Sequence, residues 1–304
     1  SFLVSISKKS LILLTGASGF LGSHVADVLS ENGYDVTIFD QKPSNYLRSD
    51  QFMVVGNILD IDQVRQAMKG QDIVYHFAGL ADLDRAASRP LESVNQNIVG
   101  TVHLLDAAVE FKVERFVFAS TIYVYSRLGG FYRCSKQATE LFVEEYNNCY
   151  GLDFTILRYG SLYGTRANKE NGIRCFLYQG LTANKIIYPG TGDEVREYIN
   201  VKDAARLSVD TLVSEYKNKH IVITGHNPMK SREMLKMIQE MIGQKISLEF
   251  SESFSDFHYT LTPYSFTPKI GSKLSSNLFT EMGQGLLECL QEISNELNPS
   301  KAED

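Results

Sequence analysis

The sequence contains no apolar run that could cross a bilayer and no excess of basic residues. A membrane-spanning helix needs about 20 predominantly apolar residues in succession, and no stretch of the chain approaches that length. The formal net charge is −6, whereas domains that bind nucleic acid are usually basic. We therefore expect neither membrane insertion nor a nucleic-acid partner.

The sequence also has few cysteines and histidines, and their positions exclude two kinds of site. The four cysteines lie far apart and form no CxxC pair, which argues against a disulfide framework and against a metal site. The six histidines are scattered and form no ligand cluster. The apolar segment 2–6 is short and is followed by Lys8 and Lys9, the wrong order for a signal peptide. These features predict reduced thiols and a cytoplasmic location, with no metal.

In the first half of the chain, apolar runs of strand length alternate with stretches of helical spacing. Continuous apolar strands are typical of a parallel sheet that is covered by helices on both faces. We expect strands at 11–14, 35–39, 52–55, 73–77, 116–119 and 154–157, and helices near 21–32, 60–69, 91–111 and 133–149. The pattern predicts an α/β fold with a doubly wound parallel sheet of the Rossmann type.

The regular alternation fades after Gly164. Residues 165–195 are rich in glycine, asparagine and other turn signals, and 225–300 combine two helical patterns with loops. We expect a core domain over 8–165, to which 196–224 return with a strand at 220–224. Residues 166–195 and 225–300 then form a smaller C-terminal lobe, which we expect to lack a core of its own.

A glycine-rich segment, Thr15–Gly22 (TGASGFLG), directly follows the first predicted strand and opens a helix. Gly16 permits the tight turn, Gly19 lets the backbone approach a pyrophosphate, and Gly22 permits close packing of the helix on the strand. The free amides at the start of the helix favour an anion. The segment therefore predicts a dinucleotide site, although glycines that serve only the turn remain an alternative.

Asp40 follows the second predicted strand, 18 residues beyond Gly22. A carboxylate at this place accepts hydrogen bonds from both adenosine ribose hydroxyls and repels a 2′-phosphate, which favours NAD over NADP. The alternative is a solvated acid at a strand end, and Lys42 nearby weakens the preference for NAD.

A second motif, Tyr132–Lys136 (YRCSK), places a tyrosine and a lysine four residues apart at the start of a predicted helix, where they share one face. A free tyrosine with a pKa near 10 is a poor base at neutral pH. A cationic lysine and a bound nicotinamide cation both favour the phenolate. Thr121, at the end of the preceding strand, supplies the hydroxyl partner that such a base needs. The alternative for Lys136 is a solvated helix residue.

With these motifs the chain resembles the extended short-chain dehydrogenase/reductase family, in its NAD-dependent sugar-nucleotide epimerase/dehydratase branch. The resemblance is close over residues 10–205 and weak beyond them. The other segments that carry it are His76–Gly79 (HFAG), Asn97–Thr101 (NIVGT), Thr121–Tyr125 (TIYVY), Leu157–Arg166 (LRYGSLYGTR) and Arg196–Ala205 (REYINVKDAA).

The resemblance implies NAD as cofactor, a nucleotide-diphosphate sugar as substrate, and an NAD-binding core beside a substrate-binding lobe. It implies that Tyr132 is the general acid and base, that Lys136 is its electrostatic partner and a ribose ligand, and that Thr121 binds the reacting sugar oxygen. The implied cofactor-binding residues are Gly16, Ser18, Gly19, Phe20, Leu21, Gly22, Asp40, Asn57, Ile58, Phe77, Ala78, Gly79, Asn97, Tyr132, Lys136 and Tyr159. The implied substrate-binding residues are Thr121, Ser161, Arg166, Tyr188 and Arg196.

Two of the implied substrate residues have open alternatives. Arg196 would meet a substrate phosphate, because its guanidinium fork suits two oxygens, or it would pair on the surface with Glu194 or Glu197. Tyr188 would stack on a nucleobase, or it would belong to a core.

The chain also departs from the family pattern around the expected site. Only ten residues separate Thr121 from Tyr132, where the family has a longer insertion, so the pocket is expected to be more open or shaped by another chain. Ser161 replaces the usual asparagine, which weakens the substrate assignment. Gly160 replaces a bulky residue and would enlarge the pocket near the sugar.

The resemblance implies oxidoreduction at C4 of the sugar, most often as epimerisation through a 4-keto intermediate. Ile122 and Tyr123 replace the Asp-Glu pair of the 4,6-dehydratases, so dehydration would lack its proton carriers. A 4-dehydrogenase and a 4-ketoreductase use the same groups and stay open. An NAD-binding sensor and a steroid- or flavonoid-type reductase are weaker alternatives, because the catalytic positions and the arginine motifs are intact. The helices at 91–111 and 133–149 match those that pair across a two-fold axis in this family, which implies a homodimer.

Overall fold

The computed structural model describes residues 10–79, 89–126, 128–243, 245–251 and 271–301. Its main element is a sheet of eight strands in the order β14-β11-β6-β5-β4-β1-β2-β3, in which all neighbours run parallel. The strands are β1 (Leu11–Thr15), β2 (Asp35–Asp40), β3 (Gln51–Val55), β4 (Ile73–His76), β5 (Arg115–Thr121), β6 (Phe154–Tyr159), β11 (Lys219–Ile223) and β14 (Ser272–Lys273). The predicted α/β fold with a doubly wound parallel sheet is confirmed.

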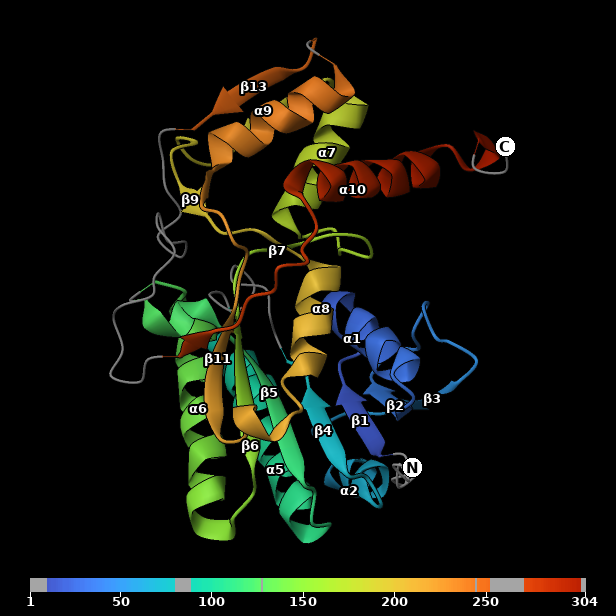
Figure 1. Ribbon diagram of the computed structural model, residues 1–304, viewed down its shortest axis with the longest axis vertical. Helices are drawn as coiled ribbons and strands as arrows, with labels where there is room; N and C mark the ends of the chain where they lie inside the picture. The colour runs from blue at the N-terminus through green and yellow to red at the C-terminus, as the bar shows by residue number, and fades with distance from the viewer. Residues whose placement is uncertain (1–9, 80–88, 127, 244, 252–270, 302–304) are drawn as a thin grey trace, which may run out of the picture.

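Helices cover both faces of this sheet (Figure 1). The helices α1 (Phe20–Glu31) and α8 (Val201–Asp210) pack on one face, and α2 (Ile61–Met68), α5 (Gly100–Glu110) and α6 (Gly130–Tyr150) pack on the other. The alternation of side chains along a strand sends successive apolar residues to opposite faces. In β1, Ile12 and Leu14 therefore join the core under α1 and α8, whereas Leu13 joins the core under α2 and α5.

Local sequence signals set the ends of several helices. The side chain of Asp60 accepts hydrogen bonds from two backbone amides at the start of α2, and Asn200 caps α8 in the same way. Such side-chain caps satisfy amides that have no partner within the helix. Gly151 ends α6 with a φ of 69°, a left-handed conformation that glycine adopts at little cost.

The predicted helix at 91–111 is divided in the structure. It consists of α4 (Pro90–Ser93), the π-helical turn η1 (Val94–Val99) and α5. A π turn widens the helix locally and shifts the direction in which its side chains point, and such turns are frequent at functional sites. The apolar spacing of the sequence did not reveal this insertion.

The second lobe lies beyond α8, in the upper part of Figure 1. It contains β7 (Leu162–Tyr163), α7 (Gly172–Ala183), β8 (Lys185–Tyr188), β9 (Val195–Arg196), β10 (Ile199–Asn200), β12 (Met229–Lys230), α9 (Ser231–Ile242), β13 (Ser247–Phe250) and α10 (Met282–Leu297). The short helical turns of the chain are η2 (Ile122–Tyr125), η3 (Ser214–Tyr216) and η4 (Pro299–Lys301).

This second lobe has a hydrophobic core of its own, so the expectation that it lacks one is wrong. Leu177, Leu235 and Leu286, from α7, α9 and α10, are fully buried in one cluster. Between α9 and α10 the chain returns to the large sheet, where β14 pairs with β11. Part of 225–300 thus belongs to the sheet rather than to the second lobe.

Candidate active site

The glycine-rich turn after β1 has no room for side chains at two positions. Gly16 has a φ of 71°, and a Cβ there would lie 2.5 Å from the backbone nitrogen of Ala78. A Cβ on Gly22 would lie 2.6 Å from the Cα of Ala17. Gly19 stands directly before α1, and Ser18, Phe20 and Leu21 complete the turn and the start of that helix. This backbone arrangement fits a bound pyrophosphate at the start of α1.

Asp40 lies at the end of β2, beside this turn. Its Oδ2 accepts a hydrogen bond of 3.1 Å from the Ser18 amide, and the Ser18 hydroxyl donates to the Lys42 carbonyl at 2.8 Å. The carboxylate is therefore held at the carboxyl end of the sheet, where the sequence predicted a ribose partner.

A cleft of about 310 Å³ runs along these strand ends. The predicted residues that line it are Gly16, Asp40, Ile58, Phe77, Ala78 and Gly79. The residues that the sequence interpretation missed are Phe39, Gln41, Lys42, Gly56, Glu92 and Gln96. Asn57 is not among the residues that line this cleft, and its Oδ1 accepts a hydrogen bond from the Leu59 amide. Glu92 and Gln96 reach the cleft from α4 and η1. Neither residue belongs to a motif that the sequence analysis identified.

Thr121, Tyr132 and Lys136 come together between the end of β5 and the first turns of α6. The hydroxyls of Thr121 and Tyr132 are hydrogen-bonded. The Lys136 Nζ lies 5.9 Å from the centre of the Tyr132 ring and donates a 2.9 Å hydrogen bond to the Ala119 carbonyl. A hydroxyl, a phenol and an ammonium group are thus assembled next to the cleft.

Burial shifts the pKa values of the two ionisable residues in this group, Tyr132 and Lys136. It raises the pKa of Tyr132 to about 12, against the effect of the Thr121 hydrogen bond. It lowers the pKa of Lys136 to about 8, against the effect of the negative charge of Glu140. Tyr132 is therefore protonated at neutral pH, and a further positive charge is needed to make its phenolate accessible.

Asn97 links this group to the cleft. A Cβ on Gly79, which has a φ of 148°, would lie 2.6 Å from the Asn97 Oδ1. The Asn97 Nδ2 donates a 2.9 Å hydrogen bond to the hydroxyl of Ser135, which lies in the second turn of α6. Asn97 thus touches both the wall of the cleft and the helix that carries Tyr132.

Tyr159 lies beside Thr121 in the register of β5 and β6, but its side chain does not point to the Thr121 group. Its ring packs in the core under α1 and α8, and its hydroxyl is hydrogen-bonded at 2.5 Å to that of Ser208 in α8. Ser161 is half-buried, and its carbonyl accepts a hydrogen bond from the Ile199 amide at 2.9 Å. The expected enlargement at Gly160 is absent, because a Cβ there would lie 2.5 Å from the Thr224 Cγ2, which occupies the space.

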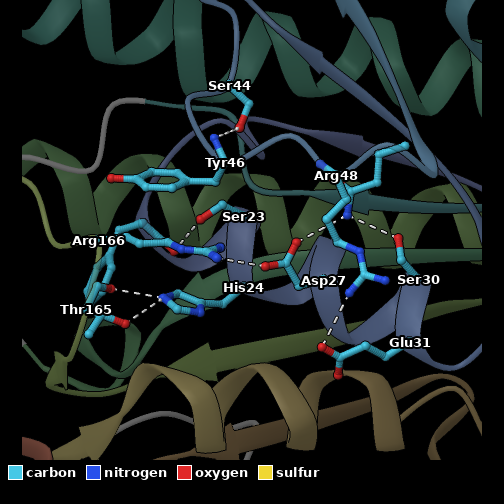
Figure 2. Close-up of polar contacts among 12 residues, drawn as sticks. Ser23, His24, Asp27, Ser30, Glu31, Ser44, Tyr46, Arg48, Thr165 and Arg166 are labelled. Carbon is cyan, nitrogen blue, oxygen red and sulfur yellow. Dashed lines mark hydrogen bonds and ion pairs between the residues drawn. The ribbon is translucent and has the colours of Figure 1, made fainter. Parts of the chain in front are cut away.

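Arg166 is held by α1 and α10 rather than by the Thr121 group (Figure 2). Its Nη2 is 2.8 Å from the Asp27 Oδ2, and its guanidinium carbon lies 4.6 Å from the centre of the Tyr46 ring. Its backbone amide donates to the carboxylate of Glu292. The neighbouring Thr165 carbonyl accepts a hydrogen bond from the His24 Nε2 at 2.9 Å. These contacts fasten the start of the second lobe to α1.

Tyr188 and Arg196 lie in the second lobe. Tyr188 is buried, with its ring between those of Phe176 and Phe250 at 5.5 and 6.1 Å, and burial raises its pKa. This position fits the core alternative for Tyr188 rather than a base-stacking role. Arg196 is half-buried on β9, opposite Met229, and its Nη1 donates to the Val195 carbonyl at 3.1 Å.

A second cavity of about 100 Å³ lies where β7, β12 and the start of α10 meet. Its lining includes four ring side chains, Tyr163, Tyr198, His226 and Phe279, beside polar residues and two methionines. The rings of His226 and Phe279 are 4.5 Å apart. No sequence motif indicated this cavity, because its residues come from segments that are far apart in the chain.

The similar curated proteins include epimerases, dehydratases and a decarboxylase of nucleotide sugars. The UDP-glucuronate 4-epimerase of Thermodesulfobacterium geofontis is 25% identical over 266 residues, which are 78% of this chain and 82% of that protein. The dTDP-glucose 4,6-dehydratase of Streptomyces niveus is 26% identical over 312 residues, which are 92% of this chain and 91% of that protein.

Among solved structures, the fold is similar to that of the UDP-glucuronic acid 4-epimerase of Bacillus cereus in complex with UDP-glucuronic acid and NAD. The TM-score is 0.82, the identity is 22%, and the match covers 94% of this chain and 99% of that chain. The model of the NAD dependent epimerase/dehydratase family matches residues 12–224. The glycine-rich turn, Asp40 and the Tyr132–Lys136 motif all lie within that range, and the chain belongs to the NAD-dependent epimerase/dehydratase family.

Proposed function

We propose that the protein is a 4-epimerase of a nucleotide-diphosphate sugar, with Tyr132 as the proton-transferring residue. The observation that carries this proposal is the group of Thr121, Tyr132 and Lys136 beside a cleft that fits NAD. The fit to NAD rests on the turn at Gly16, where a Cβ has no room, and on the Asp40 carboxylate at the end of β2.

The residues of the chain have separate tasks in this reaction. Tyr132 takes the proton of the C4 hydroxyl when the sugar is oxidised and returns a proton to the C4 oxygen when the 4-keto sugar is reduced. Thr121 donates a hydrogen bond to the same oxygen, and Lys136 favours the phenolate of Tyr132 by its charge. When bound, NAD supplies the acceptor and donor of the hydride. Inversion requires that the keto sugar present its other face before it is reduced.

The residues next to Thr121 favour epimerisation over dehydration. Ile122 is 1% exposed and apolar, and Tyr123 follows it in η2. Elimination of water needs an acid and a base beside the sugar, and neither side chain is a carboxylate. The relatives whose names describe UDP-sugar 4-epimerases support the same choice.

The test is incubation of the purified protein with NAD and, in turn, UDP-, dTDP- and GDP-linked hexoses and uronic acids. We expect a new sugar isomer by NMR without net formation of NADH. Accumulation of NADH would instead identify a 4-dehydrogenase.

The variant Tyr132→Phe should lower kcat by about 10²–10⁴-fold and keep its affinity for NAD. Tyr150→Phe, at the exposed end of the same helix, is the matched control and should keep wild-type activity.

We further propose that the protein is a cytoplasmic homodimer that pairs through α6. Leu141 and Phe142 on this helix are 60% and 43% exposed, and Val94 on the adjoining η1 is 42% exposed. Burial of such a face between two copies would remove the apolar surface from water.

The four cysteines are unpaired, which fits the reducing compartment that we propose for the protein. Among the residues that the structure describes, no helix combines the length and apolarity that a membrane span requires.

The dimer is tested by analytical ultracentrifugation of the wild type and of Leu141→Glu. A charged residue at the centre of the pairing face should convert the dimer to a monomer without loss of helical content. A wild-type monomer would exclude the pairing. Leu297→Glu, which changes an exposed leucine at the end of α10, is the control and should leave the dimer intact.

A further inference from the structure

Five polar side chains from five different elements form a buried network beneath the cleft. They are Thr15 of β1, His76 of β4, Asn97 of η1, Thr101 of α5 and Ser135 of α6, and each is at most 3% exposed. We call them the His76 network. The proposed reaction uses none of the hydroxyl or imidazole groups among them.

Donor and acceptor rules fix the direction of each hydrogen bond around His76. The Thr101 hydroxyl donates to the Asn97 carbonyl at 2.6 Å, so its oxygen accepts from the His76 Nε2 at 2.8 Å. The Nε2 therefore carries the proton, and Nδ1 accepts from the Thr15 hydroxyl at 2.6 Å. Thr15 in turn accepts from the Ala78 amide at 3.4 Å.

The imidazole must be neutral for this arrangement. Burial lowers the pKa of His76 to about 3, and the positive charge of Lys136 acts in the same direction. A second proton on Nδ1 would oppose the Thr15 hydroxyl and would place two cations close together in the interior.

The network continues from Thr101 to the helix that carries Tyr132. The Asn97 Nδ2 donates to the Ser135 hydroxyl at 2.9 Å, which donates to the Tyr132 carbonyl at 2.8 Å. Asn97 lies within the π turn, and Thr101 lies four residues after Asn97, in α5. Two series of hydrogen bonds therefore meet at Asn97. One runs from the Ala78 amide through Thr15, His76 and Thr101 to the Asn97 backbone carbonyl, and the other runs from the Asn97 side chain through Ser135 to the Tyr132 carbonyl.

We propose that His76 and Thr101 are positioning residues that hold the first turn of α6, and with it Tyr132, at a fixed place relative to the dinucleotide cleft. The inference rests on the proposed role of Tyr132. The network joins β1 and β4, which lead directly into the cleft-lining residues Gly16 and Phe77, to α6, which carries Tyr132. A shift of the phenol by a fraction of an ångström would matter, since proton transfer requires hydrogen-bond distance to the sugar hydroxyl.

Hydrogen exchange tests the positioning without reference to any activity. Thr101→Val keeps the shape of the side chain and removes its hydroxyl, whereas Thr101→Ser keeps the hydroxyl. In Thr101→Val, we expect amide exchange to become about tenfold faster over 130–136, with no change in α9 of the second lobe. Thr101→Ser should exchange like the wild type. Equal exchange over 130–136 in the wild type and Thr101→Val would overturn the proposal.

Kinetics with the substrate of the wild type provide a second readout. Loss of one buried hydrogen bond corresponds to about a tenfold effect, so Thr101→Val should have a kcat about tenfold lower with KM for NAD within twofold. Thr101→Ser should recover most of kcat. A rise in KM together with a fall in kcat in both variants would indicate a purely structural role. If the wild type converts no sugar, the proposed function fails, while hydrogen exchange still decides the positioning.

The tautomer of His76 can be measured in the unaltered protein. ¹⁵N NMR of labelled protein should show the Nε2-protonated neutral ring from neutral pH down to the acid limit of folding. A ring that is protonated on Nδ1, or that titrates near its ordinary value, would overturn the direction of the network even if the Thr101 variants do not fold.

Discussion

Two buried polar networks contact α6, and they differ in charge. The His76 network reaches the first turn of the helix through neutral groups. The second network, which we call the Glu140 network, consists of Ser120, Tyr125, Glu140 and Arg158. Its central ion pair joins the Arg158 Nη2 to the Glu140 Oε1 at 2.6 Å, with the Ser120 hydroxyl 2.5 Å from Oε2.

The difference shows how one helix can be fixed at two points by different physical means. Removal of a neutral hydrogen-bonding partner leaves one buried polar group unsatisfied, whereas removal of an ion leaves an opposite charge without compensation in the interior. The Glu140 network stands one turn from Lys136, and the charge of Glu140 opposes the fall in the pKa of that lysine. A neutral network beneath the cleft avoids a second cation beside Lys136.

The largest loss of unfolding free energy is expected when the ion pair between Arg158 and Glu140 is broken. Arg158→Met removes the cation and leaves Glu140 buried, with about 3–5 kcal/mol lost from the free energy of unfolding. Chemical denaturation of the wild type and the variant measures this loss. The double variant Glu140→Gln, Arg158→Met removes both charges and should recover most of it. If the single variant costs under about 1 kcal/mol, the pair behaves as a surface salt bridge and the comparison fails.

The second-largest effect is expected from acid, which should reduce the contribution of His76 to the free energy of unfolding. The pKa of His76 lies near 3 in the folded protein and near 6.5 in the unfolded chain, so below pH 6.5 the unfolded state binds the proton more readily. Stability is therefore complete above pH 6.5 and is lost as the pH falls towards 3. At pH 5 the loss from this group is about 2 kcal/mol relative to pH 7.

His24 adds a loss of the same sign, because burial lowers its pKa to about 4. The part that belongs to His76 is isolated in His76→Gln, in which the difference in unfolding free energy between the two pH values should shrink by about 2 kcal/mol. His103, which is half-buried on α5, supplies the control variant His103→Gln. An unchanged pH dependence in His76→Gln would show that folding does not lower the pKa of the imidazole.

The parts of the molecule that the sequence predicted correctly depend on local patterns. The alternation of apolar strands and helices predicted the parallel sheet, because burial of both faces leaves a continuous apolar run in each strand. The turn at Gly16 and the spacing of Tyr132 and Lys136 were found for a similar reason. A turn with positive φ, or two residues on one helical face, needs particular residues within a few positions of each other.

The parts that escaped prediction depend on contacts between distant segments. The space next to Gly160 is filled by Thr224, and Arg166 is held by Asp27 and Glu292. The core of the second lobe draws several residues from each of α7, α9 and α10, so a short window of sequence shows one apolar helix face but not which faces pack together. The π turn at Val94–Val99 adds one residue to a helix without altering its apolar character.

The smallest loss of unfolding free energy is expected when the Asp27–Arg166 pair is broken (Figure 2). This pair sharpens the comparison because its burial is intermediate between that of the Glu140–Arg158 pair and that of an exposed pair. The side chains of Asp27 and Arg166 are 18% and 22% exposed, against 6% and 3% for Glu140 and Arg158. Water and salt reach this pair, so Asp27→Asn should cost under about 1 kcal/mol of unfolding free energy, and less in high salt. Asp50→Asn, which breaks the more exposed pair with Arg48, is the control and should leave the unfolding midpoint unchanged. If Asp27→Asn costs as much as Arg158→Met, burial does not set the energy of these ion pairs. The fastening of the second lobe to α1 would then matter as much to stability as the ion pair inside the core.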